Sequence, residues 1–173
     1  MIQEYVFGYG MRALINRCGL IAGPWQMGKV DQGVVTLWVA HHCFGRPLRY
    51  TGFGGGGKQV RDILHVNDLF DLLQIQLRSP DRWRGEVYNI GGGRNFAVSL
   101  RELTTLCVEE TGVTLPVAEV AESAVVDVRL YVSDTRKAEN EFGWCPSRSP
   151  AQIVREIRLW IEGNRESLKG ILP

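Results

Sequence analysis

The sequence has few cysteines, no long apolar run and almost no net charge. Its four cysteines, Cys18, Cys43, Cys107 and Cys145, form no C-x-x-C pair, which favours reduced thiols over a zinc site or a disulfide framework. No apolar stretch approaches the ~20 residues of a membrane span, and the first residues show no signal-peptide pattern. The formal charge of +1 comes from interspersed acids and bases, which excludes a broad nucleic-acid-binding face. We therefore expect a cytoplasmic protein that binds neither membranes nor nucleic acids.

The sequence also lacks the pattern of a metal site. His41 and His42 are adjacent, so on a helix their side chains would point in different directions, and no third ligand stands at a suitable spacing. His65 is expected to be a strand residue bonded to backbone. We predict no bound metal, and the 173 residues are enough for one globular domain with a real core.

The chain contains an alternation of strand-like and helix-like segments without an internal repeat. The expected strands are residues 12–21, 48–51, 60–64 and 86–90, with extended chain over 115–132. The expected helices are residues 1–7, 34–44, 68–78, 99–110, 135–142 and one that starts at Pro150. Residues 12–21 are apolar on both faces, as in a strand buried in a parallel sheet. The alternation indicates an α/β fold with a partly parallel sheet.

Four of these helices carry recognisable start signals. Asn67 and Asp134 are each expected to be the N-cap of the helix that follows. Ser99 with Glu102 three residues later has the spacing of a capping box. Ser149-Pro150 supplies an N-cap and a first-turn proline to the last helix.

Two glycine clusters invite a nucleotide-binding interpretation. Residues 52–58 fit G-x-x-x-x-G-K, but Gln59 follows where a P-loop needs Ser or Thr, and residues 60–64 are extended rather than helical. Residues 91–93 follow a strand but lack the G-x-G-x-x-G spacing. The sequence therefore argues against a P-loop and favours a tight turn for the second cluster.

Arg61 is the more informative residue. It stands in a short apolar strand after the glycine-rich segment, where backbone can approach a ligand and a guanidinium can hold phosphate oxygens in a fork. Asp62 could brace it. The alternative is an internal ion pair between Arg61 and Asp62 that ties a loop to the sheet, and spacing alone leaves both interpretations open.

Short motifs in a fixed order carry a family resemblance. They are Arg17 with Gly23-Pro24, Gly57-Lys58-Gln59-Val60-Arg61-Asp62 with His65-Val66 and Asp68, residues 88–93, Ser99-Leu100 with Glu102-Leu103, and Gly143-Trp144 with Pro146. The chain resembles the C-terminal half of an extended short-chain dehydrogenase/reductase of the NAD-dependent epimerase/dehydratase family. This implies the last strands of a Rossmann-type sheet plus a small substrate-binding domain. Residues 1–33 would end the Rossmann portion, and 34–173 would form the substrate-binding portion, interleaved with the last Rossmann strand near 86–90.

Within the family, Gln26, Asp31-Gln32-Gly33 and residues 57–62 are most similar to the CDP-paratose 2-epimerases, also called CDP-tyvelose epimerases. The resemblance implies that NAD takes hydride from C2 of a CDP-sugar and returns it to the other face. It also implies the following roles. Arg61 contacts the diphosphate of the sugar nucleotide, and the backbone of Tyr50 and Thr51 holds the base. Gln32 and Gly33 cover the nucleotide. The backbone at Cys18 and Gly19 runs next to the nicotinamide. For Cys18, plain strand packing is the alternative.

The chain departs from the family pattern at three positions. Leu20 and Ala22 stand where many relatives have Asn and Tyr, so a polar substrate contact is lost or replaced. A second phosphate-binding arginine usually lies three residues before the aspartate that matches Asp127, but here that residue is Ala124. Arg129 is placed to compensate, with a solvated strand arginine as the alternative. Asp127 and Arg129 complete the predicted substrate-binding residues.

Two family motifs are absent from the sequence. No G-x-x-G-x-x-G occurs near the start and no Tyr-x-x-x-Lys occurs anywhere, and neither Tyr5 nor Tyr9 has the lysine that would lower its pKa. We therefore predict a fragment that lacks the catalytic residues, is inactive alone, and binds no NAD without the rest of the enzyme. A free-standing sugar-nucleotide binding or assembly module is the alternative. An in-frame Tyr-x-x-x-Lys upstream of Met1 would support the enzyme fragment, and a stop codon close upstream would support the module.

The strand at residues 12–21 would have an uncovered edge in such a fragment. Exposed apolar edges favour self-pairing, so we expect homo-oligomers that bury this strand. A dilute monomer without sheet contacts between chains would count against this expectation.

Overall fold

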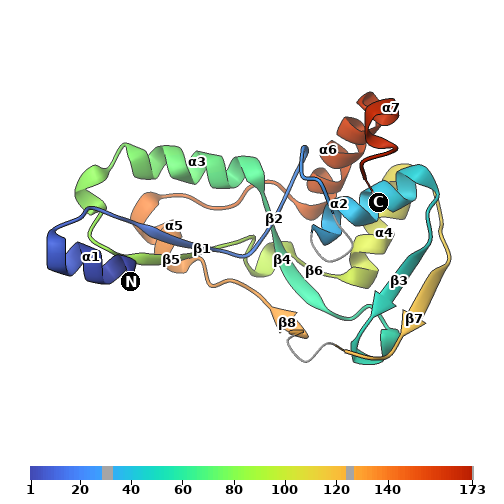
Figure 1. The fold of residues 1–173 in the computed structure, drawn as a ribbon, viewed down its shortest axis with the longest axis horizontal. Helices are drawn as coiled ribbons and strands as arrows, with labels where there is room; N and C mark the ends of the chain where they lie inside the picture. The colour runs from blue at the N-terminus through green and yellow to red at the C-terminus, as the bar shows by residue number, and fades with distance from the viewer. Residues whose placement is uncertain (29–32, 124–126, 173) are drawn as a thin grey trace.

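Strand β4 (Val60–His65) lies near the middle of the molecule and pairs along both of its edges (Figure 1). The structure is a computed structural model that describes residues 1–28, 33–123 and 127–172. The second half of β4 pairs in parallel with β2 (Leu20–Ala22). Its first half pairs antiparallel with β6 (Ala97–Ser99) and parallel with β8 (Leu130–Tyr131). β4 therefore joins strands from four distant parts of the sequence.

Two further strand pairs lie at opposite ends of the molecule. β1 (Ile15–Cys18) and β5 (Val87–Ile90) pair in parallel at the end that holds the N-terminus (Figure 1). β3 (Leu48–Thr51) and β7 (Val117–Val120) pair in parallel at the other end. Gly19 alone separates β1 from β2, so one chain segment serves both the β1–β5 pair and the sheet around β4.

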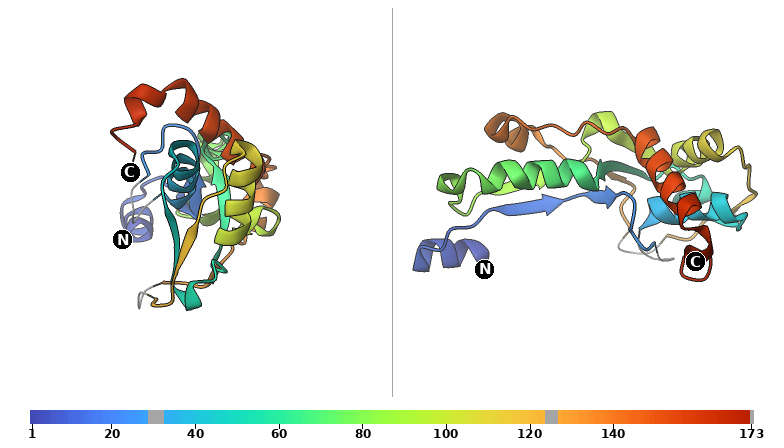
Figure 2. Two further views of the ribbon diagram at one scale, coloured as in Figure 1. Left: turned by 90° about the vertical axis from the view of Figure 1, so that its right-hand side faces the viewer. Right: turned by 90° about the horizontal axis from the view of Figure 1, so that it is seen from above.

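Helices flank the strands at both ends. They are α1 (Ile2–Tyr9), α2 (Val34–Phe44), α3 (Val66–Leu77), α4 (Leu100–Thr111), α5 (Arg136–Phe142), α6 (Pro150–Gly163) and α7 (Arg165–Leu168), with 3-10 turns η1 (Phe53–Gly55), η2 (Pro80–Arg82) and η3 (Arg94–Phe96). Seen from above, α3 runs alongside β1 (Figure 2). Helices α2, α4 and α6 pack together beside β3 and β7 (Figure 1).

The apolar side chains form two clusters. The larger one fills the space between α2, α4 and α6, and its fully buried members include Val35, Ile153 and Ile157. The smaller one joins α3, β5 and α5 through Leu72 and Ile90. Both clusters reach β4, the first through Ile63 and the second through Leu64, because adjacent strand residues face opposite sides.

Most of the expected elements are confirmed. The helix at 34–44 and the strand at 48–51 have the predicted bounds, and the chain is α/β as expected. Ser99 and Glu102 form the predicted capping box, and Ser149 caps α6 by accepting the N–H of Gln152. One face of α6, which includes Ile153 and Ile157, is buried. The expected domain division at residue 33 stays a prediction.

Three expectations were wrong in detail. Asn67 is not the N-cap of its helix, because α3 begins at Val66 and His65 accepts the Asn67 N–H through Nδ1 at 3.0 Å. The formal N-cap of α5 is Thr135, although the Asp134 carboxylate accepts the Arg136 N–H. Residues 12–21 form two short strands broken at Gly19, and no β1 residue is fully buried, because only β5 pairs with β1 among the described residues.

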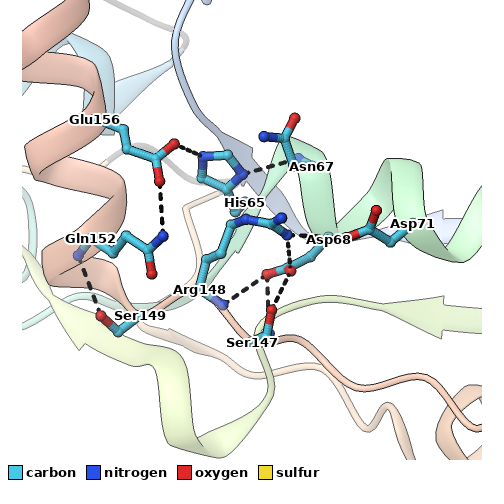
Figure 3. Close-up of polar contacts among 9 residues, drawn as sticks. All are labelled: His65, Asn67, Asp68, Asp71, Ser147, Arg148, Ser149, Gln152 and Glu156. Atoms are coloured by element: carbon cyan, nitrogen blue, oxygen red, sulfur yellow. Dashed lines mark hydrogen bonds and ion pairs between the residues drawn. The ribbon is translucent and has the colours of Figure 1, made fainter.

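A buried polar cluster fixes the start of α3 (Figure 3). The side chain of Asp68 accepts the backbone N–H groups of Ser147 and Arg148, the Ser147 hydroxyl, and the Arg148 guanidinium at 2.5 Å. Asp68 is only 1% exposed. Every polar atom of this carboxylate is thus paired, and the cluster ties α3 to the segment that leads into α6.

His65 links the same region to α6 (Figure 3). Its Nδ1 accepts a backbone N–H, so in the neutral ring Nε2 carries the proton. Nε2 lies 3.0 Å from the carboxylate of Glu156 on α6. This arrangement confirms the expectation that His65 is a strand residue bonded to backbone.

Replacing Asp68 by Ala should lower the free energy of unfolding by about 3–5 kcal/mol, because Arg148 would be left without its buried partner. Asp71 is the matched control, since it also pairs with Arg148 but is exposed. Its replacement by Ala should cost less than about 1 kcal/mol. Urea unfolding followed by circular dichroism measures both, and equal costs for the two variants would contradict the assignment.

The capping box of α4 predicts a pH-dependent contribution to stability. Ser99→Ala should cost about 1 kcal/mol of unfolding free energy. The Ser99 backbone N–H and hydroxyl donate to the Glu102 carboxylate and lower its pKa. The extra stability of wild type over Glu102→Gln is therefore present above about pH 4.3 and lost as the pH falls through the lower folded-state pKa. Unfolding measured from pH 7 to pH 3 tests this, and a difference that does not change with pH would contradict it.

Candidate functional site

Arg61 lies in the first half of β4 with its guanidinium at the surface. It donates from one terminal nitrogen to the Val60 carbonyl at 2.9 Å and from the other to the Asp127 carboxylate at 3.2 Å. The side chains of Arg61 and Asp127 are 30% and 33% exposed. The guanidinium is therefore oriented by its own strand and by one solvent-facing carboxylate, an arrangement that an incoming anion can enter.

The expected bracing of Arg61 by Asp62 was wrong, and so was the alternative of an internal pair between them. Adjacent residues on a strand point to opposite faces, so the Asp62 side chain lies on the buried side of β4. There its Oδ2 accepts the Gly93 N–H at 3.0 Å. The partner of Arg61 is Asp127, which is 66 residues away in sequence.

The glycine-rich loop that follows β3 lies next to Asp127. A Cβ atom placed on Gly52 would lie 3.3 Å from Ser123 Oγ, 3.4 Å from Gln59 Nε2 and 3.5 Å from Asp127 Oδ2. Phe53 follows with a φ of 49°, which is uncommon for a residue other than glycine. The P-loop interpretation is excluded, because the residues after Lys58 lead into strand β4 rather than a helix.

Gly19 links β1 to β2 and lies close to Asp62, whereas Cys18 ends β1 and pairs with Ile90 of β5. The parallel register pairs Leu20 with Ile63, so continuing it by one residue places Gly19 beside Asp62. A Cβ on Gly19 would lie 3.6 Å from Asp62 Oδ1. Partial burial raises the pKa of the Cys18 thiol, which is therefore neutral at pH 7. Of the predicted cofactor-side residues, Gly19 thus lies close to Asp62, the neighbour of Arg61 in β4.

The other predicted site residues are distributed as follows. The Tyr50 side chain is buried, where its hydroxyl donates to Thr104 at 2.8 Å, and Thr51 offers its carbonyl to Gln59. Gly33 is the N-cap of α2, with a φ of 74°. Arg129 is exposed beside β4, and its carbonyl accepts the Val60 N–H. Gln32 lies outside the described residues. Their proposed roles in binding stay predictions.

The sequence did not predict the roles of two residues in this region. Gln59 donates to the Thr51 carbonyl at 2.5 Å and holds β3 against the start of β4. Ser123 accepts the Phe53 N–H at 2.7 Å and fixes the glycine-rich loop. The role of Gln59 could have been predicted from its place two residues before Arg61 in the motif. No local sequence pattern marks Ser123.

The described residues contain neither a candidate metal site nor a helix that could span a membrane. Within 1–28, 33–123 and 127–172, no group of three or more His, Cys, Asp or Glu side chains is placed to hold a metal ion. In the same ranges, none of the helices has the length and apolar character needed to cross a membrane. A surface cleft of about 660 Å³ lies between residues 92–96 and 132–136.

Comparison with known proteins places these features in a family. A family profile described as "NAD dependent epimerase/dehydratase family" matches residues 1–91. CDP-paratose 2-epimerase of Salmonella typhi is 29% identical over 171 residues, which cover 91% of this chain and 47% of that protein. dTDP-glucose 4,6-dehydratase of Streptomyces antibioticus is 32% identical over 157 residues, which cover 91% of this chain and 44% of that protein.

Solved structures show the same similarity. dTDP-glucose 4,6-dehydratase from Bacillus anthracis, in complex with NAD, superposes with a TM-score of 0.79 at 29% identity and covers 98% of this chain and 50% of its own. UDP-glucose 4-epimerase from Thermotoga maritima, with UDP-glucose, gives a TM-score of 0.77 at 27% identity, with coverages of 96% and 50%. The chain spans about half the length of these relatives. With its profile match over residues 1–91, the chain belongs to the NAD-dependent epimerase/dehydratase family.

Proposed function

We propose that this chain is the nucleotide-sugar-binding part of an NAD-dependent epimerase or dehydratase, and that Arg61 holds the diphosphate of its substrate. The observation that carries the proposal is the partly exposed Arg61–Asp127 pair, which lies beside the glycine-rich loop on the strand that pairs with β2. UDP-glucose and NAD are named with solved relatives. This supports a site that brings a sugar nucleotide and a dinucleotide together.

The chemistry of Arg61 suits a diphosphate. A planar guanidinium binds two phosphate oxygens at once, and each charge-assisted hydrogen bond contributes roughly 1.5–3 kcal/mol. Asp127 is a weak competitor, because an exposed ion pair contributes less than about 1 kcal/mol. A diphosphate can therefore displace Asp127 from Arg61, and the freed carboxylate can accept ribose hydroxyl groups.

We further propose a CDP-sugar as the preferred substrate. A CDP-paratose 2-epimerase is among the relatives, and the resemblance of residues 57–62 predicts the same branch. Arg129 is the proposed second phosphate contact, since it precedes β8 beside the same strand.

The residues of this chain supply only part of an NAD site. Cys18, the last residue of β1, and Gly19 can lie next to a nicotinamide. The sequence has no G-x-x-G-x-x-G to bind the pyrophosphate and no Tyr-x-x-x-Lys. NAD bound in the complete enzyme would supply the hydride acceptor and donor for a transient oxidation of the sugar. This chain's own contribution is to bind and orient the substrate through Arg61 and its neighbours.

Replacing Arg61 by Gln should weaken the binding of CDP about tenfold or more, which corresponds to the loss of about 1.4 kcal/mol or more. Arg129→Gln should weaken it less, because Arg129 would contact only one phosphate. Arg49→Gln on the exposed side of β3 is the matched control and should leave binding unchanged. Isothermal titration calorimetry measures all three, and equal affinity of Arg61→Gln and wild type for CDP would contradict the proposal.

The chain alone should not turn over CDP-sugars in the presence of NAD. The acid–base pair that a transient oxidation needs is absent from its sequence, so substrate should bind without isomerisation. Chromatography of CDP-paratose incubated with NAD and the purified chain measures this. Robust epimerisation would show that other residues of this chain supply the acid and base.

A further inference from the structure

Asp62 has properties that packing alone does not explain. Its side chain is 0% exposed, and the hydrogen bond from Gly93 is its only one among the described residues. Its second oxygen, Oδ1, is buried without a partner in the part of the chain that the structure describes. The equally buried Asp68, by contrast, is fully paired and faces Arg148. A buried carboxylate with a single hydrogen bond is costly, so its presence requires a specific role.

The Asp62 side chain lies next to the segments that adjoin both strands flanking Arg61. Its Oδ2 holds the N–H of Gly93, which opens the turn leading directly into β6, and β6 pairs Val98 with Arg61. On the opposite edge, β8 pairs Tyr131 with Arg61. The chain that leaves β8 then places Ser133 against the same carboxylate, around Gly91 and Gly19.

Contacts in this region leave no space for a Cβ atom on the glycines. A Cβ atom on Gly91 would overlap both Asp62 Oδ2 and Ser133 Oγ, and one on Gly92 would overlap the Ile63 carbonyl. The turn at residues 91–93 is therefore in direct contact with β4. Ser133 is 7% exposed, and its hydroxyl, like Asp62 Oδ1, has no partner among residues 1–28, 33–123 and 127–172. Both unpaired atoms face Gly19, where a Cβ would lie 3.0 Å from Ser133 Oγ.

We propose that Asp62 is the positioning residue for Arg61: its buried carboxylate fixes the entry to β6 through the Gly93 N–H, lies beside Ser133 after β8, and so holds Arg61 in place on β4. The proposal rests on the proposed function, in which Arg61 binds the diphosphate. Asp62 itself touches no ligand. It acts from the far side of β4, and its loss should let β6 and β8 shift and move the guanidinium away from the phosphate position.

The test compares nucleoside diphosphates with their nucleosides, because a positioning effect on Arg61 concerns only the phosphates. Calorimetry on the full chain measures CDP, UDP and dTDP against cytidine, uridine and thymidine, at a temperature where every variant is folded. The variants are Asp62→Ala, Asp62→Asn, whose amide oxygen can still accept the Gly93 N–H, and Arg61→Gln. Asp68→Asn is the matched control, since it weakens a buried carboxylate cluster that does not contact the strands flanking Arg61.

Asp62→Ala should weaken diphosphate binding about tenfold and leave nucleoside binding unchanged, while Asp62→Asn and Asp68→Asn should stay within about threefold of wild type. Should Asp62→Ala not fold, Asp62→Thr takes its place, because threonine suits a strand and its hydroxyl lies one bond closer to the backbone. Wild-type diphosphate affinity in the Ala or Thr variant, or equal losses for diphosphate and nucleoside, would overturn the inference. Unchanged diphosphate affinity in Arg61→Gln would instead overturn the proposed function.

Discussion

The pairing of β4 on both edges is the constraint on which the rest of the structure depends. Because β4 is held by β6 on one edge and by β8 and β2 on the other, its successive side chains must point to opposite faces, and residues 62–65 are buried on both of them. Arg61 then faces outward toward Asp127, and Asp62 faces inward toward Gly93. One strand thus carries both the candidate ligand contact and the group that holds it in place.

The same strand connects the two apolar clusters and the two ends of the molecule. Ile63 enters the cluster around α2, α4 and α6, and Leu64 enters the one around α3, β5 and α5. At the end of the strand, His65 caps α3 and faces Glu156 on α6 (Figure 3). The position of β4, and with it of Arg61, is therefore fixed by packing on both of its faces.

Local signals made most of the fold predictable from the sequence. The capping box at Ser99 and the proline at position 150 set helix starts that the structure confirms. The errors arose where a long-range contact decides the outcome. His65 replaces Asn67 as N-cap because β4 continues to it, and Asp127 replaces Asp62 as the partner of Arg61 because strand alternation separates neighbours. No local pattern could reveal Ser123, whose partner Phe53 lies far away in sequence, or Ser133, which lies next to the equally distant Gly91.

The central claim is that this chain binds a nucleoside diphosphate through Arg61. A crystal structure of the chain with CDP tests it most directly. The account predicts the diphosphate within hydrogen-bonding distance of the Arg61 guanidinium, with Asp127 displaced from it and the base over the Gly52–Gly57 loop. A diphosphate bound elsewhere, for example in the cleft between residues 92–96 and 132–136, with the Arg61–Asp127 pair intact, would contradict it.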